Sequence, residues 1–70
     1  MISEVLYMQI RLFQQFCERN KMSSVAANKL FKECAIWKYI EDCYDTLHMS
    51  GDEYILGDIQ QIIAAKGVKL

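Results

Sequence analysis

Apolar residues recur at helical spacing in four stretches of the chain, and this pattern predicts an all-α fold. The first expected helix begins at residue 2 or 3 and ends near residue 19. The second covers about residues 24–34, and the third runs from residue 36 to residue 47 or 48. The last begins at residues 57–58 and ends within residues 64–67. The short connections predict one compact bundle of four short helices, a single helical domain over residues 1–70.

Polar residues and glycines at the ends of these stretches set the expected boundaries. Ser3 is the expected N-cap of the first helix, and Ser23 or Ser24 that of the second, because serine side chains accept hydrogen bonds from free helical N–H groups. Gly51 is expected at positive φ in the break after the third helix. Gly67 is expected to end the last helix in the same way.

The segment before the last helix has two interpretations. Asp58 and Gln61 match the D-x-x-Q form of a capping box, so we expect the helix to start at Gly57 and Asp58. Residues 53–56, Glu-Tyr-Ile-Leu, are apolar and alternating. They form either one short extended segment or a helical turn, and the pattern does not separate the two.

The first helix is apolar over an unusually wide arc. Its hydrophobic residues cover about 200° of the circumference, whereas a surface helix needs about 100° to cover one core. A central position in the bundle explains the excess, and so does contact with a second chain. A chain of 70 residues also buries only about 60% of the surface that its unfolded form exposes, so a homodimer is one expectation.

Composition narrows the class of protein. The net charge of −1 argues against a general nucleic-acid binder and against a polybasic membrane anchor. Three cysteines without a C-x-x-C pair indicate reduced thiols rather than a disulfide framework. No signal peptide and no apolar run of about 18 residues stand out. We therefore expect a cytoplasmic protein with no membrane contact.

His48 is the only histidine and the main catalytic candidate. Asp45 and Glu53 are the carboxylates near it in sequence, and a minor enzyme centred on His48 is one alternative. The simpler interpretation is structural, with His48 bonding the end of its helix. Our preferred pairing is His48 to Glu53 across the Gly51 turn. Cys43 and His48 lack two further donors at suitable spacing, so neither a metal nor a cofactor is expected.

The second and third helices also resemble a helix-turn-helix, so a DNA-binding transcriptional regulator is a further alternative. The expected recognition helix carries IWKYIEDCYD, which is acidic and aromatic. Basic side chains normally contact phosphates and guanine edges there, so nucleic acid is not the expected partner.

Aromatic side chains are numerous for so small a domain, and Tyr and Trp dominate protein interfaces. The first helix, Trp37 and Tyr39 are therefore the expected contact surface. The candidate binding residues are Trp37, Tyr39, Asp45, His48, Glu53 and Tyr54. Together these features predict a small non-enzymatic protein-interaction domain that acts on a protein partner.

Residues 44–54, YDTLHMSGDEY, form a Y-D-x-L-H-x-x-G-x-E-Y string. With this string the chain resembles, over about residues 4–66, a family of short bacterial proteins catalogued as a domain of unknown function. Its members tend to be encoded beside genes for ADP-ribosyltransferase-like proteins of toxin type. The resemblance implies an antitoxin or accessory partner of such a neighbour. Ala35 departs from the family, which tends to have Gly before the third helix, and this puts the tightness of that turn in doubt.

Overall fold

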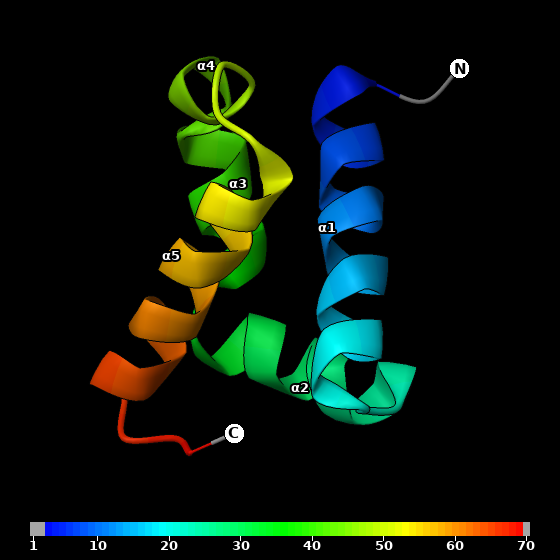
Figure 1. Cartoon of the computed structure of the whole chain (residues 1–70), viewed down its shortest axis with the longest axis vertical. Coiled ribbons are helices and arrows are strands. Elements are labelled where there is room, and N and C mark those ends of the chain that lie inside the picture. Colours follow the sequence, from blue (N-terminus) through cyan, green and yellow to red (C-terminus); the bar gives the residue numbers. More distant parts are fainter. Residues whose placement is uncertain (1–2, 70) are drawn as a thin grey trace.

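The computed structural model describes residues 3–69, and within them the chain is helical with no strand, which confirms the all-α prediction. Its helices are α1 (Glu4–Asn20), α2 (Ser24–Glu33), α3 (Ile36–Asp42), α4 (Tyr44–Leu47) and α5 (Asp52–Ala65). Figure 1 shows α1 along one side and α2 crossing at its end. The chain then rises through α3 to α4 and returns along α5.

Serine caps set the first two helices where the sequence places them. The Ser3 hydroxyl accepts a hydrogen bond from the Leu6 N–H at 3.1 Å, and the Ser23 hydroxyl accepts one from the Ala26 N–H at 3.2 Å. Gly67 follows α5 at φ 85°, so its predicted role as the C-terminal cap is confirmed.

The predicted third helix is divided at Cys43 into α3 and α4. The Thr46 N–H donates to the Cys43 carbonyl at 3.0 Å, three residues away, which tightens the chain there. The Cys43 N–H still donates to the Tyr39 carbonyl at 3.0 Å. The two segments are therefore one helical run with a local kink, and the predicted four-helix bundle has five segments among the described residues.

The predicted start of the last helix is wrong, because α5 begins at Asp52. Residues 53–56 are helical, so an extended segment there is also wrong. Asp58 lies inside α5 and does not cap it; its carboxylate accepts a hydrogen bond from the Tyr39 hydroxyl at 3.2 Å. The D-x-x-Q pattern predicted a cap wrongly because the Asp58 side chain instead takes part in a contact between α5 and α3.

Positive φ occurs at Ala35 rather than at Gly51. Gly51 has φ −76° and ψ 154° and is the N-cap of α5, so its predicted left-handed conformation is wrong. Ala35 has φ 55° and ψ 36° between α2 and α3. Its carbonyl accepts the first helical bond of α3, from the Tyr39 N–H at 3.0 Å. The turn that glycine would make easily is therefore tight even with alanine.

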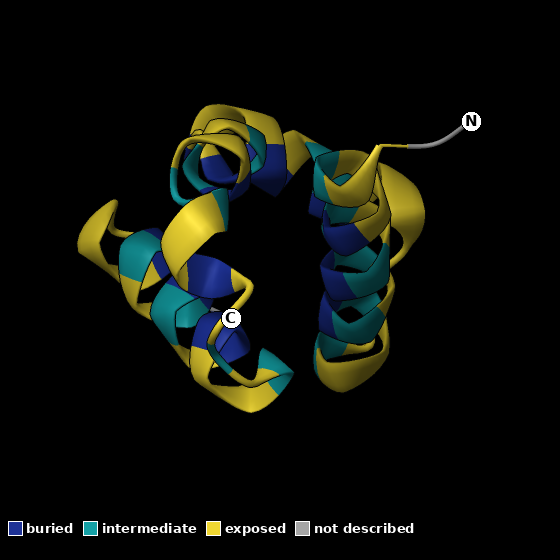
Figure 2. Ribbon diagram, turned by 90° about the horizontal axis from the view of Figure 1, so that it is seen from above, coloured by how far each residue is buried: buried dark blue, intermediate teal, exposed yellow. Residues whose placement is uncertain are grey.

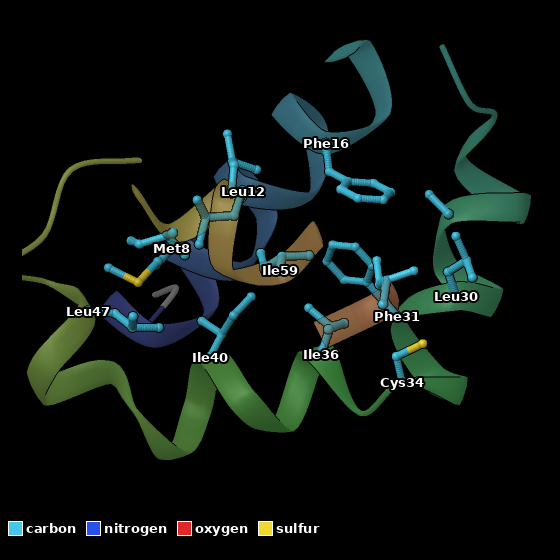
Figure 3. Packing of buried hydrophobic residues seen from close by; sticks show 14 residues of the cluster. Met8, Leu12, Phe16, Leu30, Phe31, Cys34, Ile36, Ile40, Leu47 and Ile59 are labelled. Carbon is cyan, nitrogen blue, oxygen red and sulfur yellow. The ribbon is translucent and has the colours of Figure 1, made fainter. Parts of the chain in front are cut away.

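One hydrophobic cluster holds the helices together. α1 contributes Met8, Leu12 and Phe16, spaced four residues apart on one face. Figure 2 shows the buried faces turned inward, and Figure 3 shows the side chains that meet there. Phe31 lies at the centre of an aromatic group, with its ring 5.1 Å from that of Phe16. The other buried members are Ala27, Leu30, Cys34, Ile36, Ile40, Leu47, Ile55, Leu56, Ile59 and Ile63.

Candidate functional site

Trp37 is fixed in place on the side of α3 that meets α1 and α2. Its ring lies 5.2 Å from that of Phe13 and 4.9 Å from that of Phe31. The indole N–H donates to the Asn28 side-chain oxygen at 3.0 Å, and the Gln9 amide donates to the Trp37 carbonyl at 2.9 Å. The half-buried indole is therefore a rigid edge of the surface.

A shallow apolar hollow of about 370 Å³ lies beside Trp37. Its lining comes from Phe13, Ser24, Val25, Asn28 and Trp37. Val25 is 83% exposed, which is unusual for a valine on a helix of a small domain. The hollow therefore offers apolar area that the chain itself does not cover.

The outer side of α1 extends this apolar surface. Leu6, Tyr7 and Ile10 are exposed by 44%, 60% and 39%. Ile10 lies one helical turn before Phe13, so the exposed residues lead to the hollow. We call this surface the α1 face, and it consists of Leu6, Tyr7, Ile10, Phe13, Val25 and Trp37. The wide apolar arc of α1 therefore includes side chains that the core of this chain does not bury.

Tyr39 lies on the opposite side of α3, against α5. Its hydroxyl donates to the Asp58 carboxylate at 3.2 Å. Burial and then the negative charge of Asp58 raise the pKa of Tyr39 to about 12. Tyr54 is close enough to contribute to this shift and is 64% exposed. We call this surface the Tyr39 flank, and it consists of Tyr39, Tyr54 and Asp58 together with Asp42, which lies one helical turn after Tyr39.

His48 stacks on Tyr44, with 5.3 Å between the ring centroids and 21° between the ring planes. The Tyr44 hydroxyl donates to the Glu4 carboxylate at 3.1 Å and so ties α4 to the start of α1. Burial and this bond raise the pKa of Tyr44. Asp45 is exposed beside them. Tyr44 therefore joins α4 to the start of α1, and its hydroxyl is directed at Glu4 rather than at Asp45.

The predicted pair of His48 and Glu53 is wrong, because Glu53 pairs with Arg19 of α1. One residue earlier, the Asp52 carboxylate accepts hydrogen bonds from the Arg11 guanidinium at 3.0 Å and from the Gln15 amide at 2.8 Å. These bonds, that to Arg11 first, lower the pKa of Asp52. Both acids lie in the first turn of α5, where the helix dipole also favours negative charge.

The candidate residues therefore do not form one site. Trp37 belongs to the α1 face, Tyr39 and Tyr54 to the Tyr39 flank, and Glu53 to the contact between α1 and α5. Sequence reasoning missed Val25 and the partners of Asp52. The spacing of Arg11, Gln15 and Arg19, four residues apart on one side of α1, was the available signal for these partners.

Residues 3–69 contain no group of three or more His, Cys, Asp or Glu side chains placed to hold a metal ion. None of their helices combines the length and the apolar character that crossing a membrane requires. Cys17, Cys34 and Cys43 are free thiols, of which Cys34 is buried.

Comparison with known proteins gives one family. The family described as "Protein of unknown function (DUF3791)" matches residues 7–66. No curated protein and no solved structure gives a significant match. The match covers α2 to α5 and all of α1 from Tyr7 onward, so within the two surfaces it leaves out Leu6.

Proposed function

Starting from the fact that the chain belongs to the DUF3791 family of proteins of unknown function, we propose that it is a small non-enzymatic protein-interaction domain. The observation that carries this proposal is the set of large apolar and aromatic side chains left outside a complete core. Leu6, Tyr7, Ile10, Val25, Met49 and Tyr54 are all exposed. Single exposed apolar residues are common on any protein, but a group of them with aromatic members, as on the α1 face, is typical of interfaces.

The resemblance drawn from the sequence adds a class of partner. We propose that the chain acts as the antitoxin or accessory partner of an ADP-ribosyltransferase-like protein encoded by an adjacent gene. Its binding region is the Tyr39 flank. Tyr54 supplies an exposed aromatic anchor, and the bond from Tyr39 to Asp58 holds the second ring rigid. Asp58 and Asp42, of which Asp42 also pairs with Lys38 at 3.4 Å, supply carboxylates that suit a basic surface on the partner.

The geometry gives less support to an enzyme. The carboxylate of Glu53 is engaged by Arg19, and the His48 ring is stacked on Tyr44. Tyr39 has the most perturbed environment, but its pKa is raised to about 12. A raised pKa makes a tyrosine a poor general base near neutral pH.

The negative charge on α3 argues against the DNA-binding alternative. In the possible recognition helix, α3, Glu41 and Asp42 are exposed on the outer side, and Lys38 is paired with Asp42 at 3.4 Å. A phosphate backbone would be repelled by this side of the helix.

The test is a calorimetric titration of the purified chain with the purified ADP-ribosyltransferase-like protein encoded beside it. We expect saturable binding that Tyr54→Ala weakens by at least about tenfold, as for a central aromatic anchor. Val25→Ala, an exposed residue of the opposite α1 face, is the matched control and should leave the affinity unchanged. Absence of binding by the unmodified chain would refute this partner, and equal binding by Tyr54→Ala would refute the Tyr39 flank.

A further inference from the structure

The α1 face has an apolar centre with opposite charges at its two ends. α3 and α4 run antiparallel to α1, because Phe13 meets Trp37 while Glu4 meets Tyr44. Glu41 lies one helical turn beyond Trp37, towards Glu4. Glu41 therefore makes the end of the face marked by Leu6 acidic, whereas Glu4 lies on the other side of α1 and accepts a hydrogen bond from the Tyr44 hydroxyl.

The other end of the face is basic. Lys29 and Lys32 lie one and two helical turns beyond Val25 on the outer side of α2, and both are exposed. Lys21 is exposed in the turn that joins α1 to α2. Glu18 of α1 and Glu33 of α2 are the acids near this end, so three lysines against two carboxylates leave it with one net positive charge. Figure 1 shows how far apart the two ends lie, with α4 at one extreme of the molecule and α2 at the other.

We propose that a second copy of this chain occupies the α1 face, in an antiparallel dimer with twofold symmetry. In such a dimer the same patch contacts itself, so Ile10 and its neighbours form the centre. The twofold axis places Glu41 of one copy opposite Lys29 of the other, once at each end of the interface. A parallel arrangement would instead place like charges together, which costs free energy.

The dimer also accounts for the exposed residues of α1. Burial of Leu6, Tyr7 and Ile10 would add apolar contact to a domain whose small size limits its own core. Gln14 and Ser24 lie beside the centre of the face, and Glu18, which lines one hollow with them, is exposed at its edge. The Tyr39 flank lies on the other side of α3 and stays free. The dimer and the partner proposed above therefore stand or fall separately.

Sedimentation equilibrium of the purified chain tests the dimer. We expect a dimer in the micromolar range, and Ile10→Lys should weaken it by at least about tenfold because it places a charge at the twofold axis. Gln61→Lys, an exposed position on α5, is the matched control and should leave the dimer unchanged. A chain that stays monomeric up to about 500 µM would overturn the proposal, and so would an Ile10→Lys variant that dimerises normally.

Charge exchange tests the antiparallel arrangement without disturbing the core, because Glu41 and Lys29 are exposed. Glu41→Lys and Lys29→Glu should each weaken the dimer, and the double variant should recover it because both pairs are restored with reversed sign. The single effects should shrink as salt is raised. Single variants that dimerise normally, or a double variant no better than either single one, would overturn the arrangement.

Discussion

Replacing Ala35 with glycine is expected to stabilise the protein, against the usual effect of adding a glycine. Ala35 is exposed and adopts φ 55° and ψ 36°, the left-handed conformation. In that conformation the Cβ of an L-residue crowds the following carbonyl, whereas glycine has no Cβ. The side chain is at the surface, so its removal costs little packing.

The magnitude follows from two opposing contributions. Relief of the left-handed strain is worth about 1–2 kcal/mol, and the extra freedom of glycine in the unfolded chain costs about 0.4–1 kcal/mol. Ala35→Gly should therefore raise the free energy of unfolding by about 0.5–1 kcal/mol. For a domain of this size that corresponds to a rise in Tm of about 2–8 °C.

Urea unfolding followed by circular dichroism measures this difference. We expect a higher midpoint for Ala35→Gly with an unchanged slope, because the surface exposed on unfolding is the same. Ala64→Gly, an exposed alanine inside α5, is the control and should lower the stability by about 0.5–1 kcal/mol. A loss of stability in Ala35→Gly equal to that of Ala64→Gly would refute the left-handed conformation at Ala35.

Three further effects follow from single positions. Gly57→Ala should raise the free energy of unfolding by about 1 kcal/mol in thermal melts, because Gly57 is exposed inside α5 and an added Cβ meets nothing within 4 Å. A lower Tm would show that the alanine side chain does not fit at this position. Asp52→Asn should destabilise the protein near neutral pH by up to about 1 kcal/mol, since the bond to Arg11 is half exposed. That bond lowers the pKa of Asp52 below its ordinary 3.8, so its contribution to the free energy of unfolding is present above this pH and is lost as the pH falls further. The Tm values of the unmodified chain and of Asp52→Asn should therefore become equal in acid. In an absorbance titration Tyr39 should ionise near pH 12, and Asp58→Asn should lower the pKa of Tyr39. Because the pKa of Tyr39 is raised in the folded protein, stability should be lost as the pH rises from 10 to 12. Ionisation of all tyrosines near pH 10 would exclude the predicted environment of Tyr39.

The local signals in the sequence were sufficient for the helices that begin with serine. Ser3 and Ser23 cap α1 and α2 through bonds that span only three residues, so their roles can be inferred from neighbouring positions alone. The fourfold spacing of Met8, Leu12 and Phe16 likewise identifies the buried face of α1. The wide apolar arc of α1 can also be predicted from the sequence, although the sequence does not show which of its residues are buried and which are exposed.

Contacts between distant segments explain what the sequence could not predict. The sequence around Asp58 predicts a helix cap, but the Asp58 carboxylate accepts its hydrogen bond from Tyr39 on another helix. Glu53 is near His48 in sequence, whereas in space it meets Arg19, 34 residues away. The separation of Trp37 from Tyr39 depends on α3 lying between α1 and α5, which no local pattern specifies. The left-handed turn at Ala35 is imposed by the packing of α2 against α3, against the preference of alanine.

The most direct test of the central claim is the stoichiometry with which the chain changes ADP-ribosyl transfer by the proposed partner, an ADP-ribosyltransferase-like enzyme from an adjacent gene. The activity of a fixed amount of that enzyme would be measured while the purified chain is added. A non-enzymatic interaction domain predicts an effect that grows linearly and saturates at one domain per enzyme molecule. An effect that is complete with a small fraction of that amount and grows with time would show that the chain is a catalyst. A flat response at equimolar and higher amounts would contradict the proposed partner.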